Sequence, residues 1–158
     1  MIKETEIILS KWMSERIEQL RTNYNSWGVK ASGNFGASLS FKIKSYGAVL
    51  MGVDYSIFTD KGRRKGKFPP PNTIKRWIID KGIAIPSKMN INQLAYLIGR
   101  KIAKKGVVTS SNRYGKSQNL IESVFNDDAI KEIKQLLVLS QIEPIKNTMY
   151  ENFKKLER

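Results

Sequence analysis

The stretch that decides the fold runs from Asp54 to Gly106 and begins DYSIFTDKGRRKGKFPPPNTIKRWIIDKGI at residues 54–83. After a short spacer it continues as NINQLAYLIGRKIAKKG at residues 90–106. In order, it predicts the aromatic end of a strand, a loop of glycine and basic residues, three prolines and two amphipathic helices. Consecutive prolines cannot donate hydrogen bonds to a strand ladder, so a sheet must stop before them.

Two amphipathic helices follow the prolines, and each has its own boundary signals. The first is predicted over residues 73–81 with Asn72 as its N-cap, because a short polar side chain there accepts from free N–H groups of the first turn. The second is predicted over residues 91–105, where Asn90 and Gln93 stand three apart as in a capping box. Their apolar faces comprise Ile74, Trp77 and Ile78 in the first helix and Leu94, Ala95, Leu97, Ile98 and Ile102 in the second.

Before this stretch, the sequence predicts a helix and then a hairpin. Residues 2–24 predict a helix, because apolar residues recur three and four apart at Leu9, Trp12, Met13, Ile17 and Leu20. From Leu39 onward polar and apolar residues alternate, which is typical of a half-buried strand. We therefore expect an antiparallel hairpin of about 38–45 with 48–56, with Gly52 as the site of a bulge.

The C-terminal part predicts a polar loop and then helix. A helix is expected from about Asp127, and Pro144 is expected to bend it or divide it in two. Together the pieces predict an α+β fold: an N-terminal helix, a small antiparallel sheet, two central helices and a helical C-terminus. The 158 residues fit a single domain, 1–158, with the residues after about 142 as a candidate separate helical extension.

The net charge of +14 is concentrated in one part of the chain. Residues 1–60 carry seven basic and six acidic side chains, and residues 122–158 carry six and seven. Residues 61–121 carry fifteen basic side chains and a single acid, Asp80. Charge this segregated favours an acidic partner or a nucleic-acid backbone, whereas a lysine-rich surface that only keeps the protein in solution is the alternative. The candidate contact residues are Lys61, Arg63, Arg64, Lys65, Lys67, Arg113 and Lys116.

The composition argues against an enzyme. The chain has no cysteine and no histidine, which excludes disulfides, thiolate chemistry, the usual zinc sites and histidine acid–base catalysis. The Glu132-Ile133-Lys134 segment has the spacing found in some nucleases, but it falls inside an amphipathic helix. We therefore expect no catalytic, metal or cofactor site, with a nuclease of unrecognised acidic site as the enzyme alternative. No run of about eighteen apolar residues predicts a membrane span.

A helix-turn-helix is a second interpretation of the two central helices. The segment between them, residues 83–89, is longer than the usual turn of three or four residues. The outward N-terminal face of the second helix would have to read bases, and it presents Asn92, Gln93 and Tyr96. Its basic residues come at the far end, so this interpretation is not favoured.

Residues 55–106 also hold a series of short elements in a fixed order. The matching residues are Tyr55-Ser56-Ile57-Phe58, Gly62-Arg63-Arg64, Pro69-Pro70, Ile74 with Trp77, Lys81-Gly82, and LAYLIGRKI at 94–102 with Lys105-Gly106. This order resembles the tail-completion and head–tail connector (neck) proteins of tailed bacteriophages. Two departures are that Thr59-Asp60 stands where the family has an acidic residue, and that the family's aromatic–Leu end of the following loop is not clear at 110–120.

The resemblance implies a non-enzymatic structural protein of the virion, assembled in the host cytoplasm. Proteins of this kind form homo-oligomeric rings between the portal-side connector and the tail proteins. A ring around DNA would favour a basic surface in its lumen, because phosphate contacts do not depend on base sequence. A sequence-independent nucleic-acid-binding protein remains the alternative function.

Overall fold

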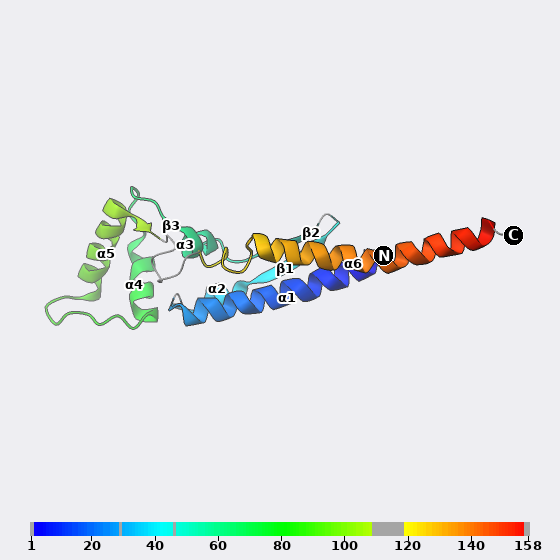
Figure 1. The fold of residues 1–158 in the computed structure, drawn as a ribbon. Coiled ribbons are helices and arrows are strands. Elements are labelled where there is room, and N and C mark those ends of the chain that lie inside the picture. The colour runs from blue at the N-terminus through cyan, green and yellow to red at the C-terminus, as the bar shows by residue number, and fades with distance from the viewer. Residues whose placement is uncertain (1, 29, 46, 109–118, 157–158) are drawn as a thin grey trace.

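The computed structural model describes residues 2–28, 30–45, 47–108 and 119–156. It is an elongated α+β structure, which confirms the predicted class (Figure 1). The order of elements is α1 (Ile2–Ser26), α2 (Asn34–Ser38), β1 (Ser40–Lys44), β2 (Gly47–Met51), α3 (Ser56–Lys61), β3 (Gly62–Arg63), α4 (Pro71–Asp80), α5 (Ile91–Lys105), β4 (Val107–Val108) and α6 (Asp127–Leu156). Helices α4 and α5 lie at one end, and α6 runs antiparallel to α1 toward the other (Figure 1).

The predicted hairpin is confirmed, but its second strand is shorter than expected. Strands β1 and β2 pair antiparallel with Phe41 opposite Leu50 and Lys44 opposite Gly47. The pairing is continuous to Met51, so the predicted bulge at Gly52 is wrong. After Met51 the chain leaves the sheet and enters α3, where the Ser56 side chain comes close to Gly52: a Cβ on Gly52 would lie 2.8 Å from the Ser56 Oγ.

The aromatic residues predicted to end that strand form α3 instead. The Ser56 hydroxyl donates to the Val53 carbonyl, and the Phe58 N–H donates to the Tyr55 carbonyl at 2.9 Å. These local bonds satisfy the backbone in a helical turn, so no strand partner is needed. As a result Ile57 and Phe58 are exposed rather than part of the sheet.

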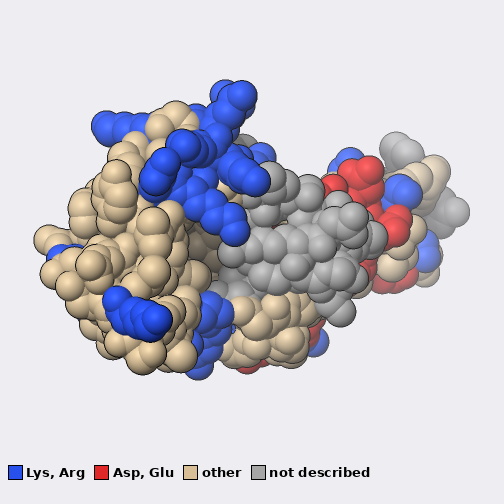
Figure 2. All heavy atoms as spheres, turned by 90° about the vertical axis from the view of Figure 1, so that its left-hand side faces the viewer, with Lys and Arg blue, Asp and Glu red and all other residues tan. Residues whose placement is uncertain are grey.

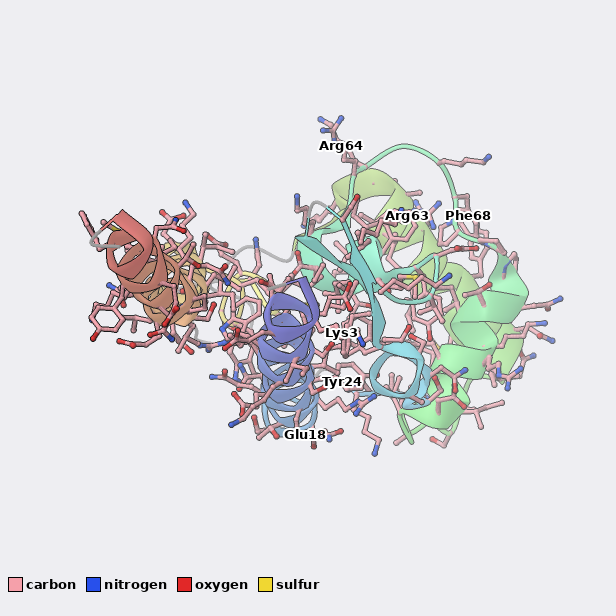
Figure 3. The ribbon with its side chains drawn as sticks, turned by 90° about the vertical axis from the view of Figure 1, so that its right-hand side faces the viewer. Lys3, Glu18, Tyr24, Arg63, Arg64 and Phe68 are labelled. Carbon is pink, nitrogen blue, oxygen red and sulfur yellow. The ribbon has the colours of Figure 1, made fainter. Side chains whose placement is uncertain are left out.

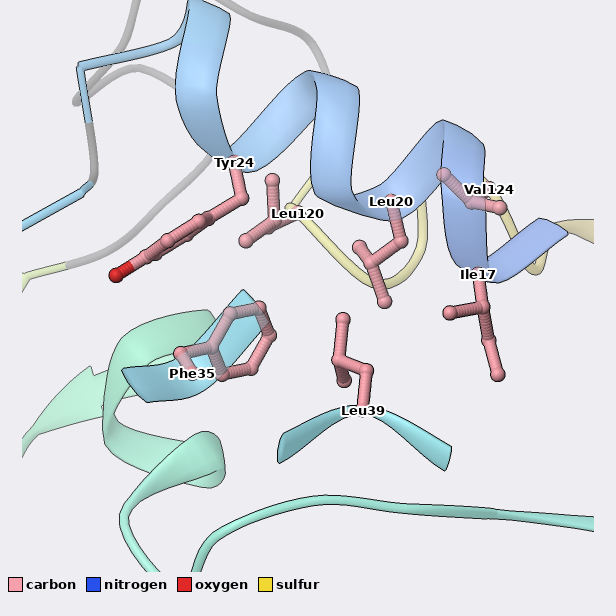
Figure 4. Packing of buried hydrophobic residues seen from close by; sticks show 7 residues of the cluster. All are labelled: Ile17, Leu20, Tyr24, Phe35, Leu39, Leu120 and Val124. Carbon is pink, nitrogen blue, oxygen red and sulfur yellow. The ribbon is translucent and has the colours of Figure 1, made fainter. Parts of the chain in front are cut away.

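The main core lies between α1, the hairpin and the segment before α6 (Figure 4). Ile17, Leu20 and Tyr24 of α1 pack against Phe35 of α2 and Leu39 at the start of the hairpin. Leu120 and Val124 close this cluster from the C-terminal side. A neighbouring cluster joins Trp12 and Met13 of α1 to Ala129 and Ile133 of α6. The apolar stripe predicted on the first helix is therefore confirmed as core.

Helices α4 and α5 have a small core of their own. Ile74 and Ile78 of α4 pack on Ala95 of α5, and this cluster shares no residue with the main core. The α4 helix begins at Pro71 rather than at residue 73, and Pro70 rather than Asn72 is its N-cap. A proline at the first helical position loses no hydrogen bond and has its φ preset for a helix, which moves the start upstream.

The α5 helix has the predicted bounds and the predicted capping box. The Asn90 side chain accepts from the Gln93 N–H at 3.0 Å, and the Gln93 side chain accepts from the Asn90 N–H at 2.9 Å. We expect Asn90→Ala to lower the free energy of unfolding by about 1 kcal/mol, because the Gln93 N–H in the first turn loses the side-chain oxygen that accepts from it. Urea unfolding followed by circular dichroism measures this. Asn92→Ala, an exposed change in the same turn, is the control, and an equal loss there would contradict the capping role.

The α6 helix is a single helix through Pro144, so its predicted division in two is wrong. Its start at Asp127 is confirmed, and the Asn126 side chain caps it by accepting from the Ala129 N–H at 2.9 Å. None of the helices in the described parts of the chain has an apolar stretch long enough to cross a bilayer.

Candidate functional site

The candidate site is a basic surface built from two segments distant in sequence. One is the loop at residues 61–67, which contains β3, and the other is the C-terminal end of α5. We define the basic surface as Lys61, Arg63, Arg64, Lys65, Lys67, Arg100, Lys101, Lys104 and Lys105. In Figure 2 the largest group of lysine and arginine side chains lies along the top of this end of the molecule, with smaller groups on its lower side, and the acidic side chains visible in that view lie elsewhere.

Backbone hydrogen bonds hold the loop against α5. Strand β3 pairs antiparallel with β4, which places Arg63 opposite Val107. The Gly66 N–H donates to the carbonyl of Ala103 at 2.8 Å, one of the α5 carbonyls left free by the end of the helix. The Arg63 guanidinium donates to the Lys67 carbonyl at 3.1 Å and closes the loop on itself. The loop is therefore held against α5 by backbone hydrogen bonds, which the sequence did not predict.

Gly99 within α5 and Gly106 at its C-terminal end allow the loop to approach the helix this closely. Gly106 has a φ of 74°, and a Cβ there would lie 2.6 Å from the carbonyl oxygen of Arg63. Gly99 is buried, and a Cβ on it would lie 2.7 Å from the ring of Phe68. That ring lies over the helix and stacks on Tyr96 with 5.8 Å between centroids. The loop and the chain that leaves it are thus packed directly on α5.

We expect Gly106→Ala to destabilise the protein by about 2–3 kcal/mol, because the new methyl group adds backbone strain and collides with the β3 backbone. Gly82→Ala is the matched control, since Gly82 also has a positive φ, 61°, but has nothing within 4 Å of its Cβ position. The control should cost only about 1 kcal/mol of backbone strain. Thermal unfolding of both variants measures the difference, and equal losses would contradict the close contact.

The cations of the basic surface are exposed and not neutralised. Eight of the nine are exposed and Arg63 is half-buried; Figure 3 shows Arg64 projecting outward from the loop. None of the nine forms an ion pair with any residue in the described ranges. The ion pairs there join Arg16–Glu132, Arg21–Glu18, Lys131–Asp128 and Lys146–Glu143. A surface with this many unpaired like charges has a strong positive potential and attracts an anionic partner.

Asp60 fixes the base of the loop. Its carboxylate is 6 % exposed and accepts from the Ile121 N–H at 2.8 Å. This bond ties the end of α3 to the segment that enters α6, next to the main core. The Asp60 carboxylate therefore accepts a backbone hydrogen bond and forms no ion pair with the five basic residues that follow it in the described part of the chain.

The structure describes five of the seven predicted contact residues, and all five lie on the basic surface. Arg113 and Lys116 fall in residues 109–118, outside the described residues. The four basic residues at the end of α5 were missed as site residues, although the sequence placed them at a helix C-terminus. Their membership in the site follows from the tertiary bond between Gly66 and Ala103.

The residues that suggested a helix-turn-helix or a nuclease have structural roles in the fold. The Gln93 side chain caps α5, so its carbonyl is engaged and less suited to reading a base. Glu132 forms an ion pair with Arg16, and Ile133 is buried in the main core. In the described ranges no three His, Cys, Asp or Glu side chains are grouped as a metal ion would need.

Comparisons with protein-family models, with curated proteins and with solved structures found no significant match.

Proposed function

We propose that this protein is a structural virion component of a tailed bacteriophage, forming part of a ring in the head–tail connector, neck or tail-completion complex. The observation that carries the proposal is the basic surface, a strongly positive and rigid patch assembled at one end of an elongated molecule.

Three features support an assembly role. The ordered motif in residues 55–106 resembles the neck family, and in the fold its parts lie together: the loop, the proline turn and both central helices. The α4–α5 pair has a small separate core, so it can present the loop with little change in the rest of the protein. The Lys81 ammonium donates to the Gly28 carbonyl at 2.6 Å and ties this pair to the end of α1.

In this proposal the basic surface faces DNA in the lumen of the ring or an anionic patch on a neighbouring ring. Unpaired cations on a fixed backbone bind phosphates without reading bases, because each contact releases counterions whatever the sequence. A structural ring needs this property, since any part of the genome passes through it.

The test is the mass of the purified chain by light scattering, alone and with duplex DNA at two salt concentrations, together with negative-stain imaging. We expect closed rings with a central opening. A strict monomer that binds DNA tightly with a steep salt dependence would contradict the proposal and favour the alternative, a sequence-independent nucleic-acid-binding protein. That alternative is supported by the same fifteen basic residues against one acid in residues 61–121. Metal-dependent cleavage of the DNA would favour a nuclease over both.

A further inference from the structure

The C-terminal part of α6 extends beyond the rest of the fold. Up to Leu137, α6 packs against α1 through the cluster around Ala129 and Ile133. After that point it runs past the N-terminal end of α1 and projects alone (Figure 1). The projecting part carries an apolar stripe, which we call the C-terminal stripe: Val138, Ile142, Ile145, Met149 and Phe153. These side chains are between 36 and 61 % exposed.

A helix in this position needs a partner to be stable. The projecting part has about 19 residues and is roughly 28 Å long, and isolated helices of that length are marginal in water. Pro144 lies inside it and leaves the carbonyl of Ser140 without its helical N–H donor, which costs an isolated helix several kilocalories per mole. The helix nevertheless continues to Leu156. Burying the exposed stripe against a partner would supply the stabilisation that the helix lacks on its own.

The spacing of the stripe fits another helix of the same kind. Val138 and Ile145 are seven residues apart, as are Ile142 and Met149, and the two pairs alternate four and three apart. This is the a/d pattern with which two helices pack side chains into each other's gaps. Phe153 widens the stripe, which suits a helix bundle as well as a pair. A helix that presents this pattern is complementary to its own copy.

Charge also favours a second copy as the occupant. Residues 122–158 carry six basic and seven acidic side chains, and Lys146 on this part pairs with Glu143 at 3.1 Å. Two copies meeting here therefore do not repel each other. The basic surface, where copies would repel strongly, lies at the opposite end of the molecule (Figure 1). A strongly acidic or basic partner would find no complementary charge along the stripe.

We infer that the C-terminal stripe packs against the same stripe of a second copy of this chain. The contact is independent of the basic surface and of nucleic acid, and it supplies one of the joins between copies that the proposed ring requires. The stripe spans little more than two heptads, so the association is expected in the micromolar range rather than tighter.

The first test compares Ile145→Glu with Asn147→Glu in the full-length chain. Both add one negative charge to the same turn, but Ile145 is at the centre of the stripe and Asn147 is exposed on the opposite side of the helix. Sedimentation equilibrium from about 1 to 500 µM should show association of the natural chain. Ile145→Glu should raise the dissociation constant at least about tenfold, and Asn147→Glu should leave it nearly unchanged.

A second test does not depend on disrupting the contact. Because the chain has no cysteine, Ile145→Cys and Asn147→Cys each introduce a single reactive thiol. Position 145 is central, so two copies bring it together in either helix direction. A short bismaleimide should therefore link Ile145→Cys into covalent dimers much faster than Asn147→Cys. Equal linking of the two variants, or a natural chain that stays monomeric at all concentrations, overturns the inference.

The outcomes separate this inference from the proposed function. If Ile145→Glu still forms closed rings with the affinity of the natural chain, the stripe is not the contact, while the ring proposal stands. If the natural chain associates through the stripe but only into pairs and never into rings, the inference stands and the ring proposal fails. Equal weakening by both glutamate variants would also overturn the inference, because the effect would not be specific to the apolar side.

Discussion

Phe35→Ala is expected to lower the free energy of unfolding by about 3–5 kcal/mol, which is a large part of the stability of a domain this size. Phe35 is 1 % exposed and packs on Tyr24 with 4.9 Å between ring centroids. It joins α1, the start of the hairpin and Leu120 in one cluster (Figure 4). Removing the ring leaves a cavity at the point where all three meet.

Urea unfolding monitored by circular dichroism measures the loss, which should also lower the melting temperature by on the order of 10 °C. Phe58→Ala is the matched control, because Phe58 is 54 % exposed on α3 and the same atoms are removed. We expect about 1 kcal/mol or less there. Similar losses at both positions would mean that the cluster around Phe35 is not the centre of the core.

Local periodicity was sufficient to predict the parts of the fold that bury one continuous face. The stripe from Trp12 to Leu20 gave α1, strict alternation gave β1, and the capping box gave the start of α5. Each of these signals lies within a few residues of the element that it predicts, so no knowledge of the tertiary structure is needed.

The elements that were missed depend on contacts between distant segments. The α2 helix has five residues, too few to be stable alone, and it persists because Phe35 inserts into the main core. Strands β3 and β4 have two residues each and pair only because α5 returns the chain to the loop. The alternation that predicted a long second strand continues through Val53 and Tyr55, but the turn that leads into α3, held by the bond from the Ser56 hydroxyl to the Val53 carbonyl, overrides it.

The same distinction applies to the candidate site. The sequence located the basic loop by composition and placed a second basic group at the end of α5, but it did not show that they form one surface. The two groups form one surface because the Gly66 N–H donates to the Ala103 carbonyl and because Gly99 and Gly106 leave space for the loop. These glycines were visible in the sequence, yet their function becomes clear only from the atoms that a methyl group would meet.

Neutralising the loop should have the largest effect on binding to DNA. We consider the quadruple variant with Arg63, Arg64, Lys65 and Lys67 replaced by glutamine. If all four touch phosphates, the slope of log K against log salt should become shallower by about 3–4, and affinity for duplex DNA should fall at least about a hundredfold at 0.1 M salt. Fluorescence anisotropy with a short duplex at several salt concentrations measures both quantities.

The control must remove the same charge from elsewhere, since lowering the net charge alone weakens long-range attraction to DNA. Glutamine at Lys3, Lys11, Lys42 and Lys134 does so, because these exposed lysines lie on α1, β1 and α6. Long-range attraction is screened beyond about 10 Å at this salt concentration, so the control should change the slope by less than about 1. A control that matches the loop variant would show that binding follows net charge. A natural chain without affinity for DNA would contradict DNA as the partner of the basic surface, and an anionic patch on a neighbouring ring would remain as the proposed partner.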